Sequence, residues 1–146
     1  MLEEWTWSIE ATIPSDTAKA RQLLDELLAK LSENGWGEDQ TFGVHLAVEE
    51  ALMNAIKHGN QRDPDKQVSV EYGLNEKVLR ISVEDEGDGF DPRDVPDPTL
   101  DENLELPSGR GLMLMRTFMT VVEYNSKGNR VAMEKDLDAP PTEVED

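Results

Sequence analysis

Apolar side chains recur along the chain with two spacings, one typical of strands and one typical of helices. The order of these segments limits the folds that the chain can adopt. Residues 3–13, 68–72 and 78–85 alternate between apolar and polar side chains, and this two-residue period predicts strands. The segments 15–34 and 38–58 instead repeat their apolar side chains at helical spacing, which predicts two amphipathic helices. The chain therefore combines strands and helices in blocks, rather than in strict alternation.

The end of the chain completes this pattern. Helical spacing returns at 111–119, and VVEYNS and RVAMEKD form a hairpin around Gly128. The order β-α-α-β-β-loop-α-β-β predicts the α+β class, as a two-layer α/β sandwich with three helices packed on one face of a mainly antiparallel mixed sheet. We expect a single domain over residues 1–136 and a disordered acidic tail over 137–146, since the tail has no period.

The first expected strand carries an unusual face. Trp5, Trp7, Ile9, Ala11 and Ile13 share one parity and are predicted to lie on the same side of the strand. A strand of this kind can pair with a second subunit.

Composition excludes several classes of protein. The 146 residues carry a net charge of −18 and contain no cysteine, so disulfides and thiolate metal sites are excluded and a reducing cytoplasm is indicated. The negative charge disfavours binding to nucleic acid or to an anionic membrane and favours basic protein surfaces, although solubility alone also explains it. We expect no secretory signal at the acidic start, and no apolar run reaches the ~20 residues of a membrane span.

Two polar side chains lie at the margin of the apolar face of the second expected helix. Glu50 and Asn54 are four residues apart, so a helix places them side by side. A carboxylate can activate a hydroxyl group, and an amide oxygen suits magnesium, although an ordinary solvated pair is the alternative. Lys57 and His58 follow at the helix end, where a polyphosphate can reach them. Glu49 competes for the role of base but points about 100° away, so we interpret it as solvent-facing or structural.

A second group ends the expected strand VLRISVED. Asp85 can accept hydrogen bonds from one edge of a base, and Gly87 and Gly89 let a flat ring approach the backbone. A simple hairpin turn explains the same residues. A calcium loop of the EF-hand kind does not, because the two glycines occupy positions where that loop needs acidic ligands.

A third group, Ser108-Gly109-Arg110-Gly111, precedes the last expected helix. Free N–H groups and the helix dipole attract anions at such an N-terminus, and Arg110 can add a charge-assisted bond to a phosphate. A turn explains this motif as well, and the P-loop and the motifs of ordinary protein kinases are absent. Taken in their order, the three groups predict an ATP site.

The three groups resemble the N, G1 and G2 boxes of the Bergerat-fold ATP-binding superfamily, which includes gyrase, the Hsp90 chaperones and the histidine kinases. The phrases VEEALMNAIKHGN, ISVEDEGDGFDP and SGRGLMLMRTFM are similar above all to those of small bacterial anti-sigma factor serine kinases. The resemblance covers roughly residues 5–136 and leaves no room for the phospho-accepting helix pair of a histidine kinase.

The resemblance implies a role for each matching position. Glu50 would be the general base and Asn54 the magnesium ligand, while Asp85 would bind the adenine amino group. The other positions that would contact ATP are Lys57, Gly87, Gly89, Gly109, Arg110 and Gly111, and residues of about 90–110 would form the ATP lid.

The resemblance further implies a cytoplasmic serine/threonine-protein kinase that uses ATP and Mg²⁺. Such a kinase phosphorylates a small anti-sigma-factor antagonist and switches partners with a sigma factor, and so regulates transcription; a homodimer is typical of the family. The alternative is a non-catalytic, nucleotide-dependent binding module that sequesters a basic protein partner. An acidic domain without a nucleotide site is a third interpretation.

Overall fold

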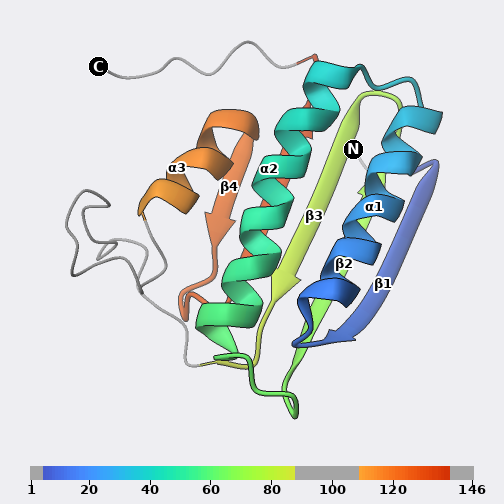
Figure 1. Cartoon of the computed structure of the whole chain (residues 1–146). Coiled ribbons are helices and arrows are strands. Elements are labelled where there is room, and N and C mark those ends of the chain that lie inside the picture. The colour runs from blue at the N-terminus through green and yellow to red at the C-terminus, as the bar shows by residue number, and fades with distance from the viewer. Residues whose placement is uncertain (1–4, 88–108, 139–146) are drawn as a thin grey trace.

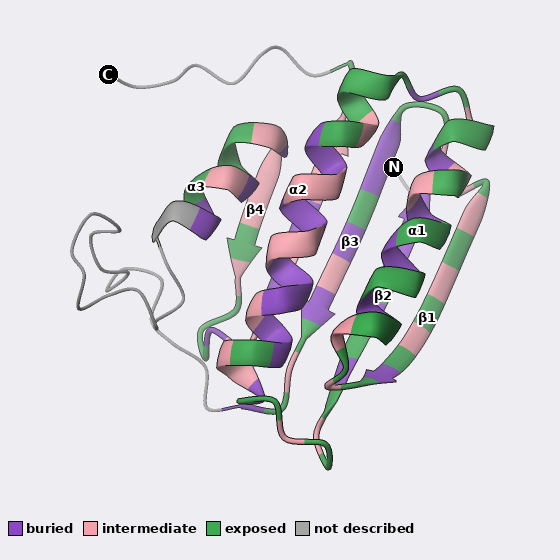
Figure 2. Cartoon of the chain, viewed as in Figure 1, coloured by how far each residue is buried: buried purple, intermediate pink, exposed green. Residues whose placement is uncertain are grey.

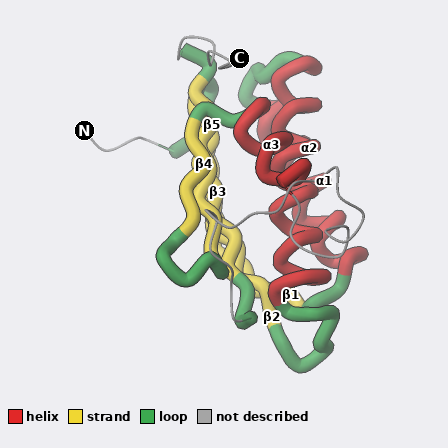
Figure 3. Tube along the Cα trace, turned by 90° about the vertical axis from the view of Figure 1, so that its left-hand side faces the viewer, coloured by secondary structure: helices red, strands yellow, loops and turns green. Residues whose placement is uncertain are grey.

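The structure, a computed structural model, describes residues 5–87 and 109–138 and has two layers, a sheet and a set of helices on one of its faces (Figures 1 and 3). The elements in chain order are β1 Trp7–Pro14, α1 Thr17–Glu33, α2 Glu38–Asn54, the π-helical turn η1 Ala55–Gly59, β2 Gln67–Leu74, β3 Val78–Glu84, α3 Gly109–Phe118, β4 Val121–Tyr124 and β5 Arg130–Asp136. The predicted α+β sandwich is confirmed, with the helices segregated on one side as expected.

The five strands are ordered β1-β2-β3-β5-β4, which puts β3 at the centre of the sheet. Every pairing among these strands is antiparallel, so the described sheet lacks the parallel pair that a mixed sheet would contain. The central position of β3 matters for the site, because Asp85 follows its last residue.

The apolar core lies between the layers, where the buried faces of helices and sheet meet (Figure 2). Helix α1 begins within the predicted segment 15–34, and the side chain of Asp16 caps it by accepting a hydrogen bond from the N–H of Ala18 at 2.8 Å. Asn34 is its C-cap, and Gly35 takes the left-handed conformation with φ of 88° that favours glycine there. None of the helices in the described ranges combines the length and apolarity that crossing a bilayer requires.

The expectation that Trp5 shares a face with Trp7 is wrong. Strand β1 begins only at Trp7, which faces α1, with the Lys30 ammonium 4.2 Å from its ring centroid. The ring of Trp5 instead packs over Gly73 on the opposite face, with the Arg80 guanidinium 5.5 Å from its centroid. Because Trp5 precedes the strand, the alternation of Cβ directions does not reach it, and a glycine opposite leaves room for the ring.

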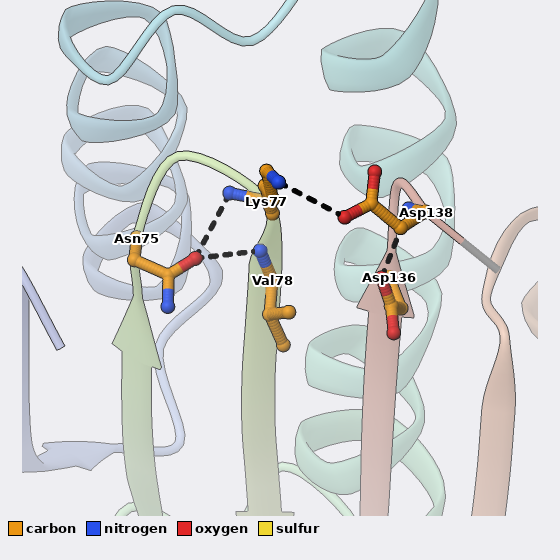
Figure 4. Close-up of polar contacts among 5 residues, drawn as sticks. All are labelled: Asn75, Lys77, Val78, Asp136 and Asp138. Atoms are coloured by element: carbon orange, nitrogen blue, oxygen red, sulfur yellow. Dashed lines mark hydrogen bonds and ion pairs between the residues drawn. The ribbon is translucent and has the colours of Figure 1, made fainter. Parts of the chain in front are cut away.

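The end of the sheet remote from Asp85 is closed by the turn between β2 and β3 (Figure 4). The side-chain oxygen of Asn75 accepts hydrogen bonds from the N–H groups of Lys77 and Val78, at 2.9 and 2.8 Å. The carbonyl of Lys77 accepts a bond from the Leu137 N–H, and the Lys77 ammonium lies 3.2 Å from the carboxylate of Asp138. The chain therefore stays attached to this turn for two residues past β5, and the rest of the expected tail lies outside the described residues.

Candidate functional site

Helix α2 brings Glu50 and Asn54 to one face near its C-terminal end and continues into the π-helical turn η1. In this turn the N–H of Asn60 bonds to the carbonyl of Ala55 at 2.8 Å, five residues back, which widens the helix by one residue. Turns of this kind are frequent at functional sites. The sequence predicted a single helix to His58 and gave no sign of the change in hydrogen bonding.

A cavity of about 150 Å³ opens between the end of α2, the end of β3 and the hairpin of β4 and β5. The residues that line it are Ala51, Asn54, Ala55, His58, Gly59, Gln61, Lys66, Val83, Asp85, Gly87, Tyr124, Gly128, Asn129 and Val131. Three of the predicted site residues, Asn54, Asp85 and Gly87, therefore meet in one cavity although they come from separate parts of the sequence.

The carboxylate of Asp85 is held in place by close backbone contacts. Its Oδ1 accepts a hydrogen bond from the N–H of Gly87 at 2.8 Å. A methyl group on Gly59 would collide with this carboxylate, and one on Gly87 would collide with the carbonyl oxygen of Gly59. Glycine is therefore needed at position 59 as well as at position 87, which was predicted. The sequence gave no sign of the need at position 59, because the group that a side chain there would strike, Asp85, is distant in sequence.

Burial raises the pKa of Asp85 above its ordinary value. The hydrogen bond from Gly87 and the positive charges of Lys127 and Lys66 counteract this effect, whereas the charge of Glu84 adds to it. The cavity thus presents a partly desolvated acceptor, which suits recognition of a hydrogen-bond donor on a flat ligand.

Glu50 lies beside the cavity, where α2 meets the start of α3. A methyl group on Gly111 would collide with the Glu50 carboxylate, so the two helices touch at this point. Burial raises the pKa of Glu50, the positive charges of His58 and Lys57 lower it, and the charge of Glu49 raises it further. A carboxylate with a raised pKa is a better proton acceptor than an ordinary glutamate.

Glu49 does not share this environment. Its Oε2 lies 2.8 Å from Nε2 of His45, one helical turn earlier, and the side chain is half exposed. This agrees with its interpretation as a structural or solvent-facing residue. Lys57 is exposed at the helix end and does not line the cavity.

The third predicted group is only partly described. Gly109 and Arg110 form the first positions of α3, and Gly111 is buried against α2. Gly89 and the expected lid, apart from these α3 positions, lie outside the described residues.

Sequence reasoning missed several residues of the cavity wall, among them Tyr124 and Asn129. Tyr124 ends β4, and burial, together with the charges of Glu50 and Asp85, raises its pKa to about 12, so its phenol stays neutral. The Asn129 side chain donates a hydrogen bond to the carbonyl oxygen of Asp85 at 3.0 Å. Both belong to the final hairpin, whose pairing with β3 was not visible in the sequence.

Most of this chain is similar in sequence to known proteins. The family described as histidine kinase-like ATPase domain matches residues 13–135. The serine-protein kinase RsbW of Bacillus subtilis is 34% identical over 138 residues, covering 88% of this chain and 85% of the relative. The anti-sigma F factor of Clostridium perfringens is 36% identical over 99 residues, covering 64% of this chain and 71% of the relative.

A solved structure shares the fold. The RsbU and RsbW domains of Rv1364c from Mycobacterium tuberculosis align with a TM-score of 0.62 at 19% identity, over 96% of this chain and 35% of that longer chain. Because the family matches most of the chain and the relatives share about a third of its residues, the chain belongs to the histidine kinase-like ATPase domain family. Within this family it is similar to serine-protein kinases and anti-sigma factors.

Proposed function

We propose that this protein is an ATP-dependent serine/threonine-protein kinase of the anti-sigma type, which phosphorylates a small anti-sigma-factor antagonist and exchanges it for a sigma factor in the cytoplasm. The observation that carries the proposal is that Asn54 and Asp85 meet in one cavity. Glu50 of α2 lies beside this cavity, where α2 contacts the start of α3. The names of the relatives support the same activity and partners.

The residues of the cavity divide the work of binding. Asp85 accepts a hydrogen bond from the adenine amino group, while Gly59 and Gly87 allow its carboxylate and the neighbouring backbone to pack closely in the cavity wall. Gly109, Arg110 and Gly111 at the start of α3 bind the phosphates, because the free N–H groups and the dipole of a helix start attract anions. Lys57, in η1, adds positive charge that acts on Glu50.

Magnesium fits the donor set at this site. Asn54 offers an amide oxygen. The described residues contain no group of three or more His, Cys, Asp or Glu side chains that could hold a metal ion without the help of a bound nucleotide. Mg²⁺ commonly takes one or two protein ligands and completes its shell with water and phosphate oxygens. Bound there, it would neutralise charge on the transferred phosphate.

Glu50 then acts as the general base. Its carboxylate accepts the proton of the acceptor serine as the hydroxyl oxygen bonds to the γ-phosphorus of ATP. The bond from that phosphorus to the β,γ-bridging oxygen breaks, and ADP leaves. Gly111 lets the start of α3 approach Glu50 closely.

The test combines binding and transfer. We expect Mg·ADP at ~100 times its dissociation constant to add about 2.7 kcal/mol to the stability of the wild type, several degrees in melting temperature, and Asp85→Asn to abolish the shift. Transfer is measured with labelled ATP and an anti-sigma-factor antagonist from the same genome. The rate of phosphoryl transfer should fall by a factor of about 10² or more in Glu50→Gln, which should still bind Mg·ADP.

Glu49→Gln is the matched control, since it removes a neighbouring carboxylate that faces His45 instead. Full transfer by Glu50→Gln would overturn its assignment as the base. Nucleotide binding without transfer by the wild type would leave the non-catalytic binding module as the function.

A further inference from the structure

Asn60 is a buried polar residue whose side chain joins three segments that are distant in sequence. Its Nδ2 donates hydrogen bonds to Oγ of Ser15 and to the carbonyl oxygen of Gln67, both at 3.0 Å. Its Oδ1 accepts a bond from the N–H of Glu86 at 2.7 Å. The amide is therefore fully used, at the point where the end of η1, the start of α1 and the start of β2 meet the residue after Asp85.

A second bond closes the same junction. Oε2 of Glu86 accepts a hydrogen bond from the N–H of Gln67 at 2.6 Å, although the Glu86 side chain is exposed. Residue 86 is thus held through its main chain by Asn60 and through its side chain by the start of β2. We refer to Asn60 and Glu86, with these bonds, as the clasp.

The clasp residues are the direct neighbours of cavity residues. Asn60 follows Gly59, and Glu86 stands between Asp85 and Gly87, all three of which line the cavity. The N–H of Gly87 is the donor that orients the Asp85 carboxylate, so the position of residues 86 and 87 decides where that carboxylate points.

Asp85 is also held from the side of β5, but only at its main chain. Its N–H donates to the carbonyl oxygen of Asn129 at 2.9 Å, and its own carbonyl accepts from the Asn129 side chain. These bonds fix the backbone of residue 85 and leave the direction of its carboxylate to the segment that follows. The clasp is what holds that segment.

We infer that Asn60 and Glu86 are positioning residues for base recognition, which hold the 86–87 segment so that Asp85 meets the amino group of adenine. This inference rests on the proposed nucleotide site. A group that only stabilises the fold would affect all nucleotides alike. A group that positions Asp85 affects the discrimination between a base with a 6-amino donor and one without it, since a site built around a hydrogen bond rejects the analogue that lacks the donor.

The experiment measures dissociation constants of Mg·ADP and of Mg·inosine diphosphate, whose base has an oxygen in place of the amino group. We expect the wild type to prefer ADP, and both Asn60→Ala and Glu86→Ala to reduce the preference, by about tenfold in Asn60→Ala, which corresponds to 1.4 kcal/mol. The reduction should come from weaker ADP binding, with inosine diphosphate affinity nearly unchanged.

Asn75→Ala is the matched control. Asn75 also fixes a turn through two accepted hydrogen bonds, but at the opposite end of the sheet (Figure 4). It should lower the melting temperature without changing the preference for ADP.

Two results separate this inference from the proposed function. A wild type that binds ADP in preference to inosine diphosphate, with the same preference in Asn60→Ala and Glu86→Ala, would overturn the clasp and leave the nucleotide site intact. A wild type that binds neither nucleotide would overturn both. A wild type that binds both nucleotides equally would overturn base recognition by Asp85, and the clasp with it, but not the nucleotide site. If Asn60→Ala does not fold, the exposed Glu86 carries the test alone.

Discussion

Two half-buried carboxylates with raised pKa values lie at one end of this small domain, and neither forms an ion pair with another described side chain. Burial of Glu50 and Asp85 costs stability in their charged forms, because water solvates a carboxylate better than the half-buried environment does. Such a cost is expected where function, rather than folding, selects the residue.

Replacement of Glu50 by Gln tests this cost. Because the folded protein binds a proton at Glu50 more tightly than the unfolded chain does, the stability contributed by this group falls as pH rises through the two pKa values. Glu50→Gln stays neutral, so it should melt at a higher temperature than the wild type at pH 7, with the difference shrinking toward pH 4. Melting curves across that range measure this difference, and Glu49→Gln, which removes a carboxylate in contact with His45, should gain less.

A lower melting temperature for Glu50→Gln than for the wild type at pH 7 would show that the fold stabilises this carboxylate instead of tolerating it. The same substitution was chosen above to remove the base, so a variant that gains stability while it loses transfer would link both properties to one buried charge.

At the scale of elements, the sequence was informative where structure follows from local spacing. The helix over 15–34 was predicted, as was the hairpin turn at Gly128, which has φ of 80°. The π-helical turn was not predictable, because it depends on the long-range bonds of Asn60 with Ser15 and Glu86. Element type is decided mostly by near neighbours, whereas the ends of elements near a site are decided by tertiary contacts.

Helices α2 and α3 approach each other at two glycines, and a pair of substitutions separates packing from function. A methyl group on Gly43 would meet the ring of Phe118, with its nearest atom at 2.9 Å, and one on Gly111 would meet the carboxylate of Glu50. We expect Gly43→Ala and Gly111→Ala to destabilise the fold by about 1–3 kcal/mol each, from overpacking of the same helix pair. Only Gly111→Ala should also lower kcat for transfer, by tenfold or more, because it displaces the base.

Denaturant unfolding measures the loss of stability in both variants, and transfer kinetics measure their kcat. A comparable loss of kcat in Gly43→Ala would mean that the distance between the helices, rather than the position of Glu50, controls the rate. An unchanged kcat in Gly111→Ala would show that the contact between Gly111 and Glu50 does not affect transfer.

At the scale of the whole molecule, the sequence predicted the layers but not the composition of the cavity. Asn54, Asp85 and Gly87 were recognised as chemistry-bearing residues, and the structure places them together. Gly59 and Asn129 were not recognised, since each acts on Asp85 across a strand or helix boundary that only the folded sheet creates. A motif records the groups that touch a ligand, but not the neighbours that hold those groups.

The net charge of −18 acts on the molecule as a whole and leads to the last prediction. A field of this sign speeds the approach of a basic protein surface and repels other acidic molecules. If the proposed sigma factor binds through basic residues, its association rate constant should fall by about tenfold or more between 50 and 500 mM NaCl, while its dissociation rate changes much less. Stopped-flow mixing measures both rates, and the melting temperature at each salt concentration serves as the control for folding. An association rate that does not depend on salt would mean that the acidic surface serves solubility alone, and that partner recognition depends on the apolar and polar contacts of the docked complex.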